Sequence, residues 1–151
     1  MTPASASLLR AASVFGFVVV LLGVMGLFAT HGLLALSPWS IGAQALAFLL
    51  LIWARLTFGL RSFHAAANPT AGGLVTTGPY HYVRHPIYAA VLLFVWSGAL
   101  VHPTLLHLGF ALVATAGTGV RIACEERLIV EAYPDYAAYG RATKRLIPGV
   151  F

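Results

Sequence analysis

Long apolar runs separated by short polar breaks dominate the chain, and they predict a bundle of membrane-spanning helices. The runs cover residues 14–36, 41–60, 82–101 and 104–120. Each falls within the roughly 17 to 25 residues that a helix needs to cross about 30 Å of hydrocarbon. Because backbone polar groups find no water in the bilayer core, helices are the expected elements. The sequence therefore predicts an all-α fold, an integral membrane helical bundle of four transmembrane helices in a single domain, residues 1–151.

The breaks between the runs indicate how the helices connect. Ser37-Pro38-Trp39-Ser40 ends the first run, and residues 61–84 form the longest polar connection, rich in Gly and Pro pairs that interrupt helices. Pro86 is tolerated in the third helix only if that helix starts close to it. Only His102-Pro103 separates the third run from the fourth. We therefore expect the last two transmembrane helices to form a tight antiparallel hairpin.

The composition changes abruptly after Val120. All the acidic residues of the chain follow it: Glu125, Glu126, Glu131 and Asp135. We expect the fourth helix to leave the bilayer here and to be interrupted at Tyr133-Pro134. Residues 121–151 are thus predicted to form a cytoplasmic tail with a C-terminal helical segment.

Composition and charge support a membrane protein. The chain is 60% hydrophobic and 9% charged, with a mean hydropathy of +0.87, whereas soluble domains carry roughly a quarter charged residues. The first run is longer than the roughly 7 to 15 apolar residues of a secretory signal, so we interpret it as a retained span.

The net charge of +5 is explained by membrane topology. The basic residues flank the predicted spans on one side, and the connections at 37–40 and 102–103 contain none. Because short loops rich in Lys and Arg stay in the cytoplasm, both termini are predicted to be cytoplasmic. This distribution of charge favours the lipid bilayer as the partner and argues against nucleic acid. The sequence does not indicate an oligomeric state.

The segment from Gly78 to Tyr88 concentrates polar and aromatic chemistry beside the third apolar run. It contains Tyr80, Arg84 and His85. A charged group near the bilayer loses solvation unless a partner compensates, so this segment is the first place to seek a site. A buried structural role remains an alternative for His85 taken alone.

The predicted hairpin brings this segment beside the end of the fourth helix, which carries Arg121, Glu125 and Glu126. Arg121 and Glu125 are four residues apart and share a helix face, either as a surface ion pair or as part of a pocket. Glu126 points about 100° away. We therefore expect only one of the two glutamates to face the pocket.

These residues resemble the integral membrane isoprenylcysteine carboxyl methyltransferases and their relatives, which include phospholipid methyltransferases. The resemblance rests on four pieces between Leu74 and Pro148: Gly78-Pro79-Tyr80, Arg84-His85-Pro86-x-Tyr88, Arg121-x-x-x-Glu125-Glu126 and Leu146-Ile147-Pro148. It implies an all-helical enzyme that binds S-adenosylmethionine beneath its C-terminal segment. Separately, the absence of His, Cys and Asp at ligand spacing argues against a metal.

The resemblance also implies roles for individual residues. Arg121 would be the catalytic residue and would face a small-molecule or lipidic methyl acceptor. The cofactor pocket would be lined by Leu74, Val75, Tyr80, His85, Pro86, Ile87, Tyr88 and Glu125.

Physical chemistry is consistent with these implied roles. Glu125 can pair with the ammonium of the cofactor, and His85 or Tyr88 can donate to its carboxylate. A carboxylate acceptor of isoprenylcysteine type is already deprotonated and could be oriented by Arg121, whereas a thiol would first have to ionise. The acceptor stays open among carboxylate, thiol and amine. The alternative from another class is a non-catalytic four-helix membrane scaffold or lipid-binding protein.

Overall fold

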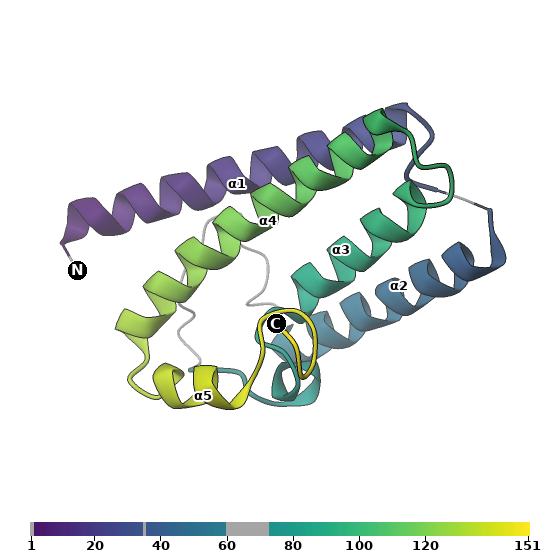
Figure 1. Cartoon of the computed structure of the whole chain (residues 1–151). Coiled ribbons are helices and arrows are strands. Elements are labelled where there is room, and N and C mark those ends of the chain that lie inside the picture. Colours follow the sequence, from purple (N-terminus) through teal and green to yellow (C-terminus); the bar gives the residue numbers. More distant parts are fainter. Residues whose placement is uncertain (1, 35, 60–72) are drawn as a thin grey trace.

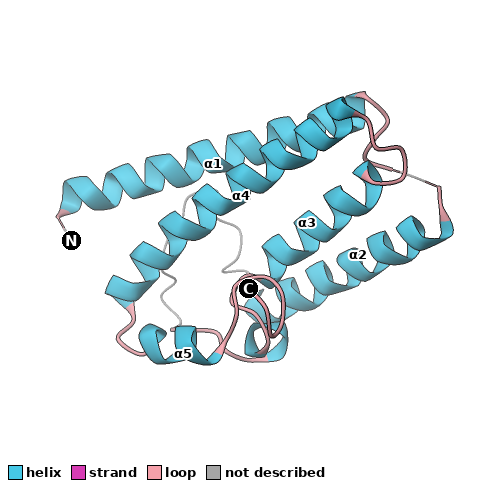
Figure 2. Ribbon diagram, in the orientation of Figure 1, coloured by secondary structure: helices cyan, strands magenta, loops and turns pink. Residues whose placement is uncertain are grey.

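The computed structural model describes residues 2–34, 36–59 and 73–151, and within these ranges it contains five α-helices and one short 3₁₀ helix. In chain order they are α1 (Pro3–Ala29), α2 (Pro38–Phe58), η2 (Gly78–His81), α3 (Pro86–Ala99), α4 (Leu105–Ala132) and α5 (Tyr136–Ala142) (Figure 1). Within the described part, the only β-type pairing is a single bridge, as the ribbon coloured by secondary structure illustrates (Figure 2). The predicted all-α class is confirmed there.

Three long helices begin at hydroxyl caps. The side chains of Thr2, Ser37 and Thr104 each accept a hydrogen bond from the backbone amide three residues on, at 3.3, 3.3 and 3.1 Å. Pro38 follows its cap at the first helical position, where its fixed φ is favourable. The expected break at 37–40 was therefore wrong in detail, because these residues start α2 instead of separating it from the first helix.

The first helix ends earlier than its apolar run. His31 has a φ of 58°, its amide bonds to the carbonyl of Phe28 at 3.1 Å, and the amide of Gly32 bonds to that of Leu27 at 2.8 Å. This is a Schellman-type ending in which a histidine occupies the position that glycine usually takes. The predicted span 14–36 was wrong at both ends, since α1 starts at Pro3 and stops at Ala29.

The third helix is shorter than predicted. It begins at Pro86 and has 14 residues, about 21 Å of helix, instead of covering 82–101. Residues 83–85 lie outside it because they pair with the C-terminal segment. The connection to α4 comprises residues 100–104, so the expected two-residue turn was also wrong.

The helices pack as two pairs. Helix α4 lies along α1 and α3 lies along α2, whereas α3 and α4 approach each other less extensively (Figure 1). The close approach of α1 to α4 depends on glycine: a Cβ on Gly23 would lie 2.7 Å from both the amide nitrogen of Ala114 and the carbonyl oxygen of Phe110. The expected tight α3–α4 hairpin is therefore looser than the α1–α4 pair.

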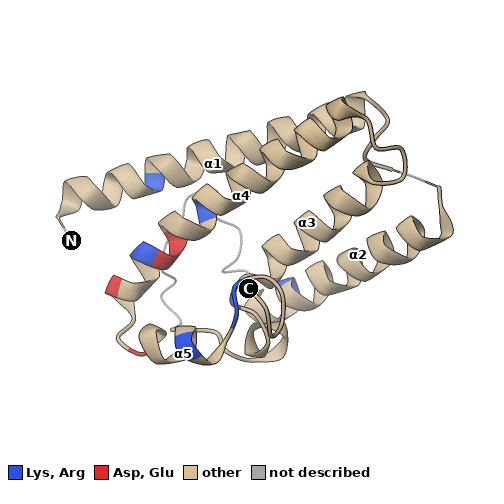
Figure 3. Ribbon diagram, viewed as in Figure 1, with Lys and Arg blue, Asp and Glu red and all other residues tan. Residues whose placement is uncertain are grey.

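An apolar core joins the two pairs where α1, α3 and α4 meet near the α3–α4 connection. Its buried members are Leu27, Leu33, Val95, Ala99, Ala111 and Ala114. The described Lys, Arg, Asp and Glu residues lie toward the other half of the molecule, which also holds both termini (Figure 3). The apolar core thus lies at one end of the bundle, and the charged residues lie at the other end.

Among the described residues, three helices are long and apolar enough to cross a membrane: α1, α2 and α4. Helix α3 is apolar but falls short of that length. The predicted spans 41–60 and 104–120 correspond to α2 and to the first part of α4, which continues without a break to Ala132. Residues 35, 60 and 61–72, which complete the predicted spans and the long connection, lie outside the described residues.

Candidate functional site

The segment before α3 is held against the end of α2. Gly78 has a φ of 57°, and a Cβ there would lie 2.6 Å from Oγ1 of Thr57. The ring of Tyr80, which is buried, packs on that of Phe58 with centroids 5.4 Å apart. Since a side chain at Gly78 would be strained and crowded, the turn that leads into α3 requires glycine.

Tyr88 of α3 meets Arg121 and Glu125 of α4. The Tyr88 hydroxyl donates to the Glu125 carboxylate and accepts from Nε of Arg121 at 2.7 Å. A terminal nitrogen of Arg121 donates to Oε1 of Glu125 at 3.2 Å. The two charged side chains are only 7% and 19% exposed, so the pair is buried and the surface-pair alternative was wrong.

Helix α1 completes the surroundings of Arg121. The other terminal nitrogen of its guanidinium donates to the backbone carbonyl of Ser13 at 3.3 Å, and the Phe17 ring lies 5.1 Å from the guanidinium carbon. A buried guanidinium with an anion, a carbonyl and an aromatic face is well compensated for its lost water. Arg121 therefore joins α1, α3 and α4 at the charged end of the bundle.

His85 lies between Glu125 and Glu126 of α4. Its Nδ1 is 3.9 Å from Oε2 of Glu125, and its Nε2 is 3.4 Å from Oε1 of Glu126. Its ring stacks on that of Tyr88 with centroids 5.7 Å apart. His85 thus reaches both carboxylates, and the expectation that only one of them faces the cofactor pocket stays a prediction. No group of three or more His, Cys, Asp or Glu in the described ranges is placed to hold a metal ion.

Glu126 gathers three cationic or potentially cationic side chains. Nε of Arg84 donates to its Oε1 at 3.0 Å, and Arg145 donates to its Oε2 from two nitrogens at 3.0 and 2.8 Å. This hydrogen bonding raises the pKa of Arg145 further above its ordinary value. Glu126 is 14% exposed, so these contacts are formed largely out of water.

The C-terminal segment pairs with the residues just before α3. The amides of Arg84 and His85 donate to the carbonyls of Lys144 and Arg145 at 2.7 and 3.0 Å. The Arg84 guanidinium also donates to the carbonyl of Gly140 at 2.6 Å and to that of Thr143. Side chain and backbone of Arg84 thus both hold the tail beside the site.

Two tyrosines of α5 lie against the same region. The Tyr139 hydroxyl donates to the backbone carbonyl of Tyr80 at 2.5 Å, and burial raises the pKa of Tyr139 to about 12. Burial also raises the pKa of Tyr136, and the negative charge of Glu126 adds to that increase. Both phenols therefore remain neutral at physiological pH, and α5 contributes neutral groups to the site.

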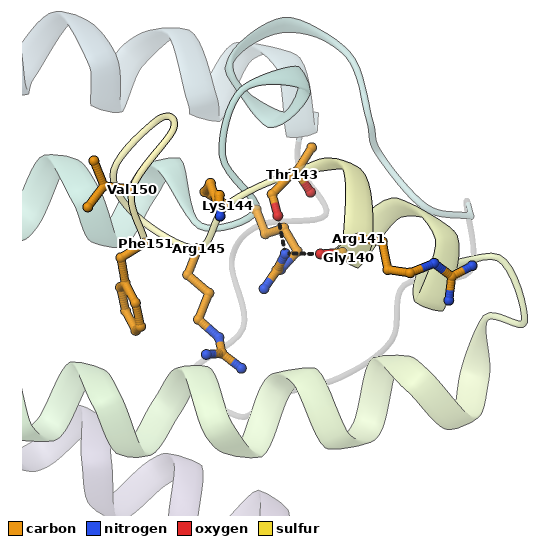
Figure 4. A pocket seen from close by; sticks show the side chains of 8 residues that line it. Gly140, Arg141, Thr143, Lys144, Arg145, Val150 and Phe151 are labelled. Carbon is orange, nitrogen blue, oxygen red and sulfur yellow. Dashed lines mark hydrogen bonds between the residues drawn. The ribbon is translucent and has the colours of Figure 1, made fainter.

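A pocket of about 220 Å³ borders the Glu126 side of this cluster (Figure 4). It is lined by Arg84, Gly140, Arg141, Thr143, Lys144, Arg145, Val150 and Phe151. In the close view, the Arg141 side chain extends away from that of Arg145. The lining includes neither His85 nor Glu125 and the volume is below the roughly 300 Å³ of typical small-molecule sites. This pocket is therefore distinct from the predicted cofactor pocket.

The family comparison covers the part of the chain that builds the cluster. The family model described as phospholipid methyltransferase matches residues 56–136, from the end of α2 to the first residue of α5. The chain belongs to the phospholipid methyltransferase family. The match takes in η2, α3 and α4, and it stops before the segment that pairs with Arg84 and His85.

Curated relatives match about half of the chain. The cobalt-zinc-cadmium resistance protein CzcN of Cupriavidus metallidurans is 36% identical over 80 residues, 50% of this chain and 35% of that protein. Methanethiol S-methyltransferase 1 of Bradyrhizobium diazoefficiens and methanethiol S-methyltransferase of Crocosphaera subtropica are each 39% identical over 70 residues, 46% of this chain. The matched stretch covers 24% and 27% of those two proteins. No solved structure matches the chain significantly.

Within the family region, the structure brings together four of the residues singled out from sequence: His85, Tyr88, Arg121 and Glu125. Pro86 is buried at the first position of α3, and Ile87 follows it, half-buried. The remaining predicted pocket residues lie in the stretch that leads to α3: Leu74 and Val75, both half-buried, and the buried Tyr80. Their side chains form no hydrogen bond with the four.

Sequence reasoning missed the tail side of the site. Arg145 and Tyr139 were not among the predicted residues, and Glu126 was left unassigned. In the structure Arg145 bonds to Glu126, and Tyr139 bonds to the backbone of Tyr80. The basic end Lys144-Arg145 was a visible signal. The partner of Arg145 on α4, Glu126, could not be identified from the sequence, because the contact depends on how the tail folds back.

Proposed function

We propose that this protein transfers a methyl group from S-adenosylmethionine to a lipidic or small acceptor at the membrane face where its charged cluster lies. The buried cluster of His85, Tyr88, Arg121 and Glu125 within the family region is the observation that supports this most strongly. A buried site of mixed charge is costly for a helical membrane protein that only needs to pack.

The groups in this cluster fit the amino acid part of S-adenosylmethionine. Its ammonium requires a carboxylate, which Glu125 offers, and its carboxylate requires donors, which His85 and Tyr88 offer. Binding of the ammonium at Glu125 would compete with the Tyr88 hydroxyl for the same carboxylate. The stretch with Leu74, Val75 and Tyr80, and the start of α3 at Pro86 and Ile87, would then supply the apolar walls.

When bound, the cofactor supplies an electrophilic methyl group on a sulfonium. The residues of the chain would align donor and acceptor and exclude water, which is the main requirement of an in-line displacement. We assign the acceptor side to Arg121, because it lies one helical turn from Glu125 and is in contact with α1 and α3. Its fixed guanidinium would orient an anionic acceptor.

Two acceptor classes are candidates. A carboxylate of isoprenylcysteine type needs no base, and Arg121 could hold it by paired hydrogen bonds. A small thiol is the second candidate, because two relatives are named methanethiol S-methyltransferases. A thiol must lose its proton, and a nearby guanidinium favours the thiolate.

The membrane arrangement belongs to the same proposal. We propose that α3 crosses the membrane as a fourth span. Because α3 is shorter than the neighbouring helices, its first residue, Pro86, would lie deeper in the bilayer than the ends of those helices. Both termini and the cluster would then face the cytoplasm, because the described basic residues lie at that end (Figure 3). An acceptor dissolved in the bilayer would reach the cluster from the side.

A methyl-transfer screen tests this proposal. Purified protein in lipid vesicles would be given radiolabelled S-adenosylmethionine and, separately, a prenylcysteine carboxylate, a short alkyl thiol or phosphatidylethanolamine. We expect transfer to one of the first two classes, and loss of that transfer in the Glu125→Ala variant but not in Glu131→Ala. Absence of transfer to all three, together with no binding of S-adenosylhomocysteine, would favour the non-catalytic scaffold.

A further inference from the structure

We infer that Glu126 is a positioning residue that latches the C-terminal segment onto His85 and so controls closure of the methyl-donor site. This inference rests on the proposed function for the identity of the ligand. Glu126 is not among the predicted cofactor-binding residues, and the proposed chemistry gives it no role.

Both carboxylate oxygens of Glu126 are occupied by the protein itself. Oε1 receives Nε of Arg84 at 3.0 Å and faces Nε2 of His85 at 3.4 Å. Oε2 receives two nitrogens of Arg145 at 3.0 and 2.8 Å. A carboxylate has roughly four acceptor positions, so this set leaves Glu126 little capacity for a ligand.

Its neighbour Glu125 is bonded differently. Glu125 contacts Tyr88, Arg121 and His85, all of them on α4 or at the start of α3. No hydrogen bond or ion pair in the described residues joins it to the tail. The two adjacent glutamates therefore divide their contacts: one stays with the helices of the site, and the other joins those helices to the C-terminal segment.

The backbone pairing of the tail lies at the same place. Arg145, which binds Glu126 through its side chain, accepts the amide of His85 through its carbonyl at 3.0 Å. Arg84 binds Glu126 through Nε and donates its own amide to the carbonyl of Lys144 at 2.7 Å. Loss of the charge on Glu126 would weaken the side-chain contacts that hold the residues before α3 and the C-terminal segment together.

Figure 4 shows the segment that would move. Lys144, Arg145, Val150 and Phe151 lie on one loop beside α4, and the Arg145 side chain extends from that loop toward the helix. The Arg145 guanidinium carbon also lies 5.6 Å from the Phe151 ring. The loop is thus held to α4 chiefly through Arg145, and Glu126 is the residue on α4 that holds Arg145.

Hydrogen exchange without ligand tests the latch directly. In the Glu126→Gln variant we expect the amides of Arg84 and His85 to exchange about tenfold faster than in wild type, because a charge-assisted set becomes neutral. Glu131→Gln, the same change at an exposed position of α4, is the matched control and should leave these amides unchanged. Equal protection in Glu126→Gln and wild type would overturn the inference.

Kinetics provide the readout that a purely structural role would not give. In Glu126→Gln we expect the KM for S-adenosylmethionine to rise about tenfold while kcat at saturating donor stays within about twofold. Arg145→Gln should reproduce this, and the double variant should be no worse than either single one. A fall in kcat with unchanged KM would contradict the latch. Failure of the wild type to bind the cofactor would contradict the proposed function. The exchange experiment uses no ligand and would still test whether Glu126 holds the C-terminal segment.

Discussion

At the scale of single residues, Arg121 connects packing to chemistry. Its guanidinium bonds to Glu125, Tyr88 and the carbonyl of Ser13, and it lies over the Phe17 ring. The four-residue spacing to Glu125 predicted the ion pair. It could not predict burial, because Ser13 and Phe17 come from a helix more than a hundred positions away in the chain.

We expect Arg121→Ala to impair turnover more than cofactor binding. Loss of the acceptor-orienting guanidinium should lower kcat by about 10- to 100-fold while the Kd for S-adenosylhomocysteine changes by about threefold or less. Arg121→Lys keeps the charge without the planar fork and should give an intermediate rate. Steady-state methyl transfer and titration measure the two quantities. Turnover equal to wild type in Arg121→Ala would remove this residue from the acceptor site.

Arg127→Ala is the matched control for that experiment. Arg127 is exposed on the same helix, α4, so its loss removes an equal charge without opening the cluster. We expect turnover close to wild type. If both variants lost turnover alike, the effect would belong to the charge of the helix and not to Arg121.

At the scale of elements, apolar runs predicted the helices well and their ends poorly. Single cap residues determine where these helices begin and end. Ser37 caps the start of α2, and His31 ends α1 in a left-handed conformation that glycine usually takes. Pro86 indicated that α3 starts nearby, but the predicted start at residue 82 was too early, because α3 begins at Pro86 itself. The pairing of residues 83–85 with the tail was not predicted, because it joins segments that are distant in sequence.

Helix α1 can approach α4 closely only while Gly23 lacks a side chain. We expect Gly23→Ala to destabilise the protein by about 1–3 kcal/mol, since the added methyl group would meet backbone atoms that cannot move aside. Gly109→Ala on α4 is the control, because nothing lies within 4 Å of a Cβ there. Thermal unfolding in detergent should show a lower Tm for the first variant only. Equal Tm values would contradict the close α1–α4 contact.

At the scale of the whole molecule, the chain separates an apolar end from a charged end. The sequence predicted this separation from the absence of Lys and Arg in its short connections, and the described charges gather accordingly (Figure 3). It predicted the wrong helix partner, since α4 packs mainly on α1. Short connections favour sequence neighbours, but the small residues on α1 and α4 allow a closer fit that sequence spacing does not indicate.

The proposed topology makes a prediction about the two faces of the membrane. With Cys124 replaced by Ala, single cysteines at Ser5 and Lys144 should react with an impermeant maleimide from one side of sealed vesicles. A cysteine at Thr104, in the α3–α4 connection, should react from the other side. Labelling of Ser5→Cys and Thr104→Cys from the same side would contradict α3 as a fourth span.

The central claim is that His85 and Glu125 lie together in order to hold the methyl donor, and titration of purified protein with S-adenosylhomocysteine tests it most directly. We expect wild type to bind and both His85→Ala and Glu125→Ala to lose about 1–3 kcal/mol of binding free energy, from lost charge-assisted contacts. The exposed controls His81→Ala and Glu131→Ala should bind as wild type does. Unchanged affinity in both His85→Ala and Glu125→Ala, or no binding by wild type, would contradict the account.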